Sequence, residues 1–117
     1  MSTACLFIGW NHPIPGRESE SYRVLMHEAV EQVEKFKRDG WCEAFEIIGL
    51  TPHCGSMNAF FLLKGERARL DELRRTDEFE GFSMRLTRLF TGYGVVPGVT
   101  LEGIRKVAER QPNLFNA

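Results

Sequence analysis

The stretch Ala4-Cys-Leu-Phe-Ile-Gly-Trp10 is short and almost wholly apolar, and a turn containing two prolines follows it. An apolar run of this length predicts a strand that is buried on both faces. Because side chains alternate along a strand, Leu6 and Ile8 lie on one face while Cys5 and Phe7 lie on the other. One layer of helices can cover only one of these faces, so the other face needs a different covering.

The segment after the turn predicts a long amphipathic helix over residues 18–39. Its apolar residues recur at intervals of three and four positions, which places them on a single stripe. The stripe consists of Tyr22, Leu25, Met26, Ala29, Val33 and Phe36. Acidic residues near the start and basic residues near the end favour the helix dipole, and Gly40 supplies a left-handed stop.

Two further strands are predicted over residues 41–50 and 58–64, where aromatic and aliphatic residues are dense. The short turn at residues 51–55 makes them an antiparallel hairpin. A helical stretch with Leu70 and Leu73 facing inward is expected to follow.

Thr76 is the expected cap of a second helical segment. The inward stripe of that segment comprises Phe79, Phe82, Leu86, Leu89 and Phe90. A last strand is predicted over residues 93–96, ending where Pro97-Gly98 turns the chain. A C-terminal helix over residues 101–110, capped by Thr100, is expected to bury its apolar side chains. These are Leu101, Ile104, Val107 and Ala108.

This order of elements predicts an α+β protein with the ferredoxin-like βαββαβ arrangement, a four-stranded antiparallel sheet and an added C-terminal helix. We expect one domain over residues 1–117, with its core over about 4–98. Both helices cover one face of the sheet, so the other apolar face would lie in water. A stable monomer rarely exposes such a patch. The sequence therefore predicts a twofold homodimer that packs sheet to sheet.

Charge and composition narrow the functional classes. The 117 residues include 15 Lys and Arg against 16 Asp and Glu, for a net charge of −1. Nucleic-acid binding usually needs a positive excess, so no nucleic-acid partner is predicted. No apolar run is long enough to span a membrane, and the N-terminus does not have the pattern of a signal peptide. We predict a cytoplasmic protein without a membrane partner.

The glycines of Gly92-Tyr-Gly-Val-Val-Pro-Gly98 do not have the spacing of a dinucleotide-binding loop, and they follow a helix rather than a strand. No other cofactor motif is present, so no cofactor is predicted.

Several short motifs together resemble the dimeric α/β-barrel superfamily, and more narrowly a group of small uncharacterised bacterial proteins. The motifs are Gly9-Trp10, Pro15-Gly-Arg-Glu18, Phe45-Glu-Ile47, Leu50-Thr-Pro-His-Cys-Gly55, Phe60-Phe-Leu-Leu63, Leu73-Arg74, Glu78-Phe79 and Gly94-Val-Val96. Cys54 stands where that group would have glycine. The superfamily includes cofactor-independent monooxygenases, haem-degrading enzymes and dehydratases. The resemblance implies a ligand pocket between the sheet and the helices of one subunit.

Trp10, Asn11 and His12 are the first candidate ligand-binding residues, because they follow one another at the end of the first strand. Some monooxygenases of the superfamily use Trp, Asn and His in their pocket, so the resemblance implies the same role here. The alternative interpretation makes Trp10 a core residue, Asn11 a turn former and His12 a solvated loop residue.

Glu46, His53 and Tyr93 complete the candidate set. If Glu46 faces the interior, burial would raise its pKa and make it a general base; otherwise it pairs with an arginine of the partner subunit or lies at the open rim. His53 either joins a site or bonds a backbone carbonyl in its turn, and Tyr93 lines a pocket or packs in the core. The imidazoles and the Cys54 thiol are too dispersed to predict a metal site.

Three functions therefore remain open. The first is a homodimer that binds a small apolar or aromatic molecule between its sheet and helices. The second is an enzyme resembling the cofactor-independent monooxygenases, using Trp10, Asn11, His12 and Glu46. The third is a structural or interaction module without a ligand. The first agrees best with the residue pattern.

Overall fold

A computed structural model describes residues 2–115. The elements in chain order are β1 (Ala4–Trp10), α1 (Glu18–Arg23), the π-helical segment η1 (Val24–Ala29), α2 (Val30–Arg38), β2 (Ala44–Gly49), β3 (Ala59–Gly65), α3 (Arg67–Leu73), α4 (Asp77–Thr87), β4 (Gly94–Val99), α5 (Leu101–Arg110) and α6 (Pro112–Phe115).

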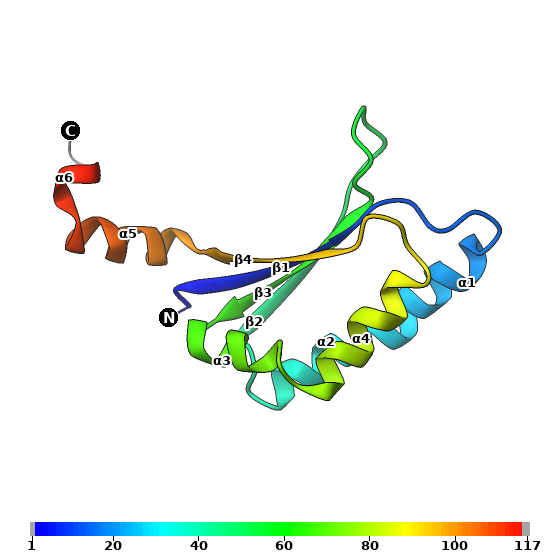
Figure 1. The fold of residues 1–117 in the computed structure, drawn as a ribbon, viewed down its shortest axis with the longest axis horizontal. Coiled ribbons are helices and arrows are strands. Elements are labelled where there is room, and N and C mark those ends of the chain that lie inside the picture. Colours follow the sequence, from blue (N-terminus) through cyan, green and yellow to red (C-terminus); the bar gives the residue numbers. More distant parts are fainter. Residues whose placement is uncertain (1, 116–117) are drawn as a thin grey trace.

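The four strands form one antiparallel sheet in the order β2-β3-β1-β4. Helices α1 to α4 lie together on one side of this sheet, and the loop between β2 and β3 projects towards the other side (Figure 1). The predicted α+β, ferredoxin-like arrangement is confirmed. Because β1 runs between β3 and β4, its apolar residues lie at the centre of the molecule.

One face of the sheet packs against the helices and forms the core. On β1 this face carries Leu6, Ile8 and Trp10, which have no exposed surface. Phe61 and Leu63 on β3 lie on the same face and are equally buried. The apolar residues predicted to face inward from α3, α4 and the segment just after α4 are all buried as expected: Leu70, Leu73, Phe79, Phe82, Leu86, Leu89 and Phe90.

The other face of the sheet, which we call the outer face, is also apolar but is not covered. Its larger apolar side chains are Cys5, Phe7, Ile48, Phe60, Leu62 and Val96. Ile48 and Val96 are exposed, and the other four are half-buried by one another. The rings of Phe7 and Phe60 are in contact, with their centroids 5.0 Å apart. The predicted second apolar face therefore exists.

The helix predicted over residues 18–39 is interrupted by the π-helical segment η1. The amide of Val30 donates to the carbonyl of Leu25, five residues back, which widens the turn. The predicted inward stripe is wrong at two positions, because Tyr22 and Met26 are exposed and Val24 is buried instead. The wider turn changes the phase of the helix, so residues at regular α-helical spacing no longer share one face.

The fourth strand does not end before Pro97, as the sequence predicted, but continues to Val99. Proline cannot donate a backbone hydrogen bond, so it is tolerated only where one side of a strand is free. Strand β4 meets that condition because it is an edge strand, with β1 as its neighbour.

Helix α5 has the predicted bounds and cap, but its environment differs from the prediction. The Thr100 side chain accepts from the amide of Gly103, as the expected cap requires. Leu101 and Ile104, predicted to be buried, are exposed because α5 extends past the end of the sheet (Figure 1). The radius of gyration is accordingly 15.9 Å, against about 13 Å for a compact chain of this length. Within residues 2–115 no helix has the length and apolar character needed to cross a membrane.

A groove between two helices

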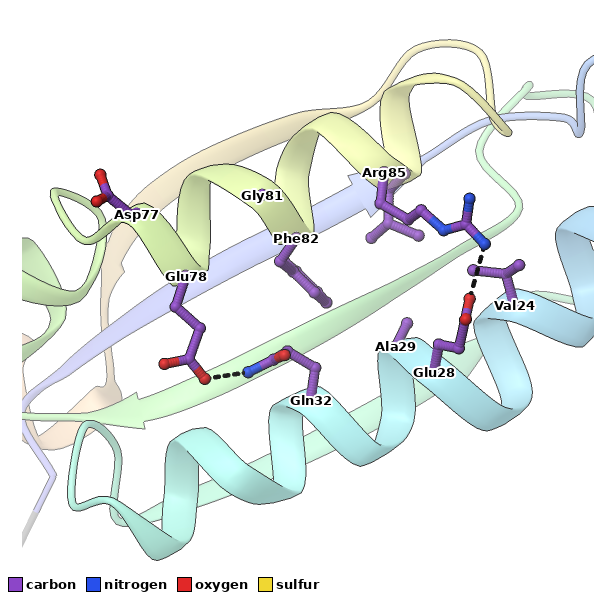
Figure 2. A pocket seen from close by; sticks show the side chains of 10 residues that line it. Val24, Glu28, Ala29, Gln32, Asp77, Glu78, Gly81, Phe82 and Arg85 are labelled. Carbon is purple, nitrogen blue, oxygen red and sulfur yellow. Dashed lines mark hydrogen bonds and ion pairs between the residues drawn. The ribbon is translucent and has the colours of Figure 1, made fainter.

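A groove of about 350 Å³ lies between η1–α2 on one side and α4 on the other. Figure 2 shows the two helices side by side, with side chains from both directed into the space between them. Its lining residues are Val24, Glu28, Ala29, Gln32, Asp77, Glu78, Gly81, Phe82, Arg85 and Leu86. This volume lies within the usual range of about 300–1,000 Å³ for small-molecule sites.

The groove has an apolar floor and polar ends. Its floor is formed by Val24, Ala29, Phe82 and Leu86, which are nearly or fully buried. At one end the amide of Gln32 donates to a carboxylate oxygen of Glu78 at 2.5 Å. Such a combination suits a ligand with an apolar body and few polar groups.

At the other end of the groove, the guanidinium of Arg85 is 3.0 Å from a carboxylate oxygen of Glu28 (Figure 2). Both side chains are about half exposed, at 49% and 54%, so this ion pair contributes little stability and can open at small cost. The Arg85–Glu28 pair is therefore a movable border of the groove rather than a rigid wall.

Two local features of the chain open the groove. The π-helical segment η1 turns Val24 and Ala29 inward while Glu28 lies at the rim. Across from it, Gly81 has no side chain, and a β-carbon built there meets no atom within 4 Å. The groove was not predicted from the sequence. Gly81, which lies among the apolar residues of α4, is the local feature of the sequence that could have indicated the groove.

The space between the sheet and the helices, where a pocket was expected, is filled by core side chains. Trp10 is completely buried there, with its ring centroid 5.2 Å from that of Phe61 and 5.5 Å from that of Phe90. Within the described residues its indole nitrogen has no hydrogen-bond partner. The core interpretation of Trp10 is thus confirmed.

Asn11 and His12 take part in a backbone connection to the loop after α4. The backbone amide of Asn11 donates to the carbonyl of Thr91 at 2.7 Å, and the backbone amide of Thr91 donates to the carbonyl of His12 at 2.8 Å. The hydroxyl of Thr91 also donates to the His12 carbonyl. The His12 imidazole itself is exposed, as the loop interpretation predicted.

Glu46 does not face the interior but lies on the outer face of the sheet. There its carboxylate is 3.1 Å from the ammonium group of Lys64, across the β2–β3 pair. The side chain is 52% exposed, so the burial that would make it a general base is not found within the single chain. Because Glu46 and Trp10 lie on opposite faces of the sheet, they do not converge on one site.

His53 lies in the loop between β2 and β3 and has the predicted turn role. Its Nδ1 is 2.9 Å from the carbonyl oxygen of Thr51. A carbonyl only accepts, so this bond requires the ring proton on Nδ1. The neighbouring Cys54 is exposed.

Tyr93 packs against the core beneath α4, and its hydroxyl is 2.7 Å from that of Ser83. Burial raises the pKa of Tyr93 to about 12, because the phenolate would lose its hydration, although the Ser83 hydrogen bond partly opposes the rise. Tyr93 therefore stays neutral at physiological pH. Across residues 2–115, no three His, Cys, Asp or Glu side chains are grouped closely enough to hold a metal ion.

Comparison with known proteins places the fold but not the family. No protein-family model matches this sequence, and no curated protein matches it. An ethyl tert-butyl ether d (EthD) family protein from Bacillus halodurans has a similar structure, with a TM-score of 0.67 and 10% identity over 85% of this chain and 99% of that one.

Two other solved structures are also similar. A dimeric protein of unknown function and ferredoxin-like fold from Bacteroides fragilis has a TM-score of 0.62 and 11% identity, over 83% of this chain and 96% of that one. The protein PA3566 from Pseudomonas aeruginosa has a TM-score of 0.60 and 16% identity, over 86% of this chain and 96% of that one. The resemblance to the ferredoxin-like group is therefore confirmed at the level of the fold, which hosts many unrelated functions.

Proposed function

We propose that this protein is a homodimer that joins through the outer faces of its two sheets and binds a small apolar or aromatic molecule in each subunit. The observation that carries the proposal is the outer face itself. Its apolar side chains, among them Phe7, Phe60 and Leu62, form a continuous patch in the middle of a sheet. Contiguous apolar patches of this kind mark interaction sites.

A second copy of the same chain is the partner that best fits this surface. Face-to-face packing buries the apolar residues of both copies at once, in an isologous contact. Pairing through the free edge of β4 is less suitable, because Pro97 in that edge strand has no amide to donate. The Bacteroides fragilis neighbour is described as dimeric, which supports a dimer but does not identify the face through which its subunits pair.

The solution mass, measured by light scattering on a sizing column, tests the dimer. We expect twice the chain mass of 13.4 kDa for the natural protein. Leu62→Glu places a charge in the centre of the outer face and should give the monomer mass. Met84→Glu is the matched control, because Met84 is an exposed apolar residue on α4, away from that face. A monomeric natural protein, or a Leu62→Glu variant that stays dimeric, would contradict the proposed interface.

The proposed ligand site is the groove between η1–α2 and α4. The space between the sheet and the helices offers no room for a ligand, because core side chains occupy it. The apolar floor favours an aromatic or aliphatic body, and the polar groups at either end would orient it.

Filling the groove tests this site. Gly81→Leu adds a side chain to the groove lining where a β-carbon meets no atom, so the fold should tolerate it. We expect 1-naphthol to bind the natural protein, and binding to weaken at least about tenfold in Gly81→Leu. Glu80→Leu adds the same side chain on α4 outside the lining and should leave binding unchanged. Unaltered binding in Gly81→Leu, or no binding by the natural protein, would count against the groove.

The compartment is part of the same proposal. Cys5, Cys42 and Cys54 are all free thiols, which fits the reducing environment of the cytoplasm. The arrangement of Trp10, Asn11, His12 and Glu46 does not favour the monooxygenase alternative, so no second function is put forward.

A further inference from the structure

A second cavity, separate from the groove, lies where α5 leaves the sheet. It has a volume of about 360 Å³. Its lining residues are Thr3, Ala4, Arg67, Val99, Gly103, Lys106, Val107 and Arg110. These residues come from the start of β1, the end of β4, the first turn of α3 and one side of α5, so the cavity exists only because the C-terminal helix is present.

All charged side chains that line this cavity are positive. Arg67, Lys106 and Arg110 are its charged members, and no acidic residue is among the lining residues. None of these three cations forms an ion pair within residues 2–115. Three like charges around one hollow repel each other unless an anion joins them.

Contacts to the backbone of residues 2, 3 and 98 position the elements that carry these cations. Gly103 lies directly against the carbonyl of Thr3, where any β-carbon would overlap the carbonyl oxygen. The Thr100 hydroxyl donates to the carbonyl of Ser2 at 2.8 Å, which ties the helix start to the same segment. On the opposite wall, the Arg67 guanidinium donates to the carbonyl of Gly98. This contact leaves the other guanidinium N–H groups of Arg67 available, since arginine has five donors.

We propose that this cavity is a binding site for a small organic anion, with one carboxylate or phosphate group and an apolar body. The anionic group would be held by Arg67, Lys106 and Arg110, because arginine and lysine form their strongest hydrogen bonds with such oxygens. The apolar body would lie against Val99 and Val107, which complete the wall. The lining residues of this cavity are distinct from those of the groove and from the apolar side chains of the outer face.

The experiment follows amide signals of Gly103 and Val107 by two-dimensional NMR while three matched probes are added. The probes are benzoate, phenyl phosphate and benzyl alcohol, which share one ring and differ in charge. We expect saturable shifts with at least one anionic probe and none with the alcohol. Saturation by benzoate alone identifies a carboxylate ligand, and saturation by phenyl phosphate alone identifies a phosphate ligand.

Two variants on α5 show whether the effect is local. Lys106→Gln removes a cation that lines the cavity and should raise the dissociation constant of the bound anion roughly tenfold. Arg105→Gln removes the neighbouring cation, which does not line it, and should change the constant less than about twofold. Equal weakening in both variants, equal shifts with the neutral alcohol, or no saturable shift with either anion would overturn the proposal.

Discussion

The backbone of Gly103 in α5 rests on the carbonyl of Thr3, close enough that a β-carbon on residue 103 would overlap the Thr3 oxygen. Two hydrogen bonds accompany this contact, one from the Thr100 amide to the Thr3 carbonyl and one from the Thr100 hydroxyl to the Ser2 carbonyl. The start of the C-terminal helix is thus fixed to Ser2 and Thr3, just before the first strand, although its apolar residues Leu101 and Ile104 are exposed.

The first prediction concerns this contact. In an exposed helix, glycine is about 1 kcal/mol less favourable than alanine, so Gly→Ala normally stabilises. Gly103→Ala should do the opposite, because α5 must shift away from Thr3. We expect a lower free energy of unfolding in urea and changed amide signals at Thr3. Gly81→Ala is the matched control, since its β-carbon would meet nothing, and it should stabilise the protein. A Gly103→Ala variant as stable as Gly81→Ala would contradict the close packing.

The second prediction concerns Tyr93 and pH. Its pKa is about 12 in the folded protein and 10.0 in an unperturbed tyrosine. A raised folded pKa means that the stability from the neutral phenol is complete below pH 10 and is lost as the pH rises from about 10 to about 12. The loss should be on the order of 1–2 kcal/mol.

Tyr93→Phe removes the ionisable group and provides the comparison. The variant lacks the Ser83 hydrogen bond, so its stability should be lower near neutral pH. Its deficit relative to the natural protein should then shrink between pH 10 and 12, because only the natural protein loses stability through this group. Phenolate absorbance should show one of the two tyrosines titrating late. A deficit that stays constant across that range would show that Tyr93 is solvated.

The third prediction separates the three cysteines by their reactivity. Burial raises the pKa of the Cys42 thiol to about 11, so at pH 8 it is almost entirely protonated as well as inaccessible. With an aromatic disulfide reagent we expect Cys54, which is exposed, to react first and Cys42 to react only on unfolding.

Cys5 reports on the proposed dimer in the same experiment. It is half-buried on the outer face, so it should be protected in the natural protein and react faster in the Leu62→Glu variant. Alanine substitution of each cysteine in turn assigns the phases. An equal rate for Cys5 in both proteins would indicate that a second copy does not cover the outer face.

The order and type of the elements could be derived from local patterns. The Thr76 side chain accepts from the Phe79 amide at 3.1 Å, as its position before an acidic helix start indicated. The hairpin of β2 and β3 followed from the short connection between them, and the two apolar faces of β1 followed from residue alternation. The turn role of His53 was predictable as well, because its partner Thr51 is only two residues away. These features depend on interactions between residues that are close together in the chain, so they can be predicted from the sequence.

The features that set the candidate sites depend on residues far apart in the chain, and only the tertiary structure decided them. Glu28 and Arg85 close one end of the groove although 57 positions separate them. The wider turn at η1 exposes Met26 and buries Val24. The sequence of this segment is equally compatible with a regular α-helix, in which Met26 would face inward. The cavity at α5 likewise needs Arg67 and Lys106 from different elements.

The sequence by itself determined the α+β order of elements, their caps and the apolar character of both sheet faces, because helix and strand periodicity are local properties of the backbone. The tertiary structure decided which residues border a hollow and which fill the core, because those positions follow from how the helices pack on the sheet. Trp10 illustrates the difference: its place at the end of β1 could be derived from the sequence, but its burial between Phe61 and Phe90 required the assembled core.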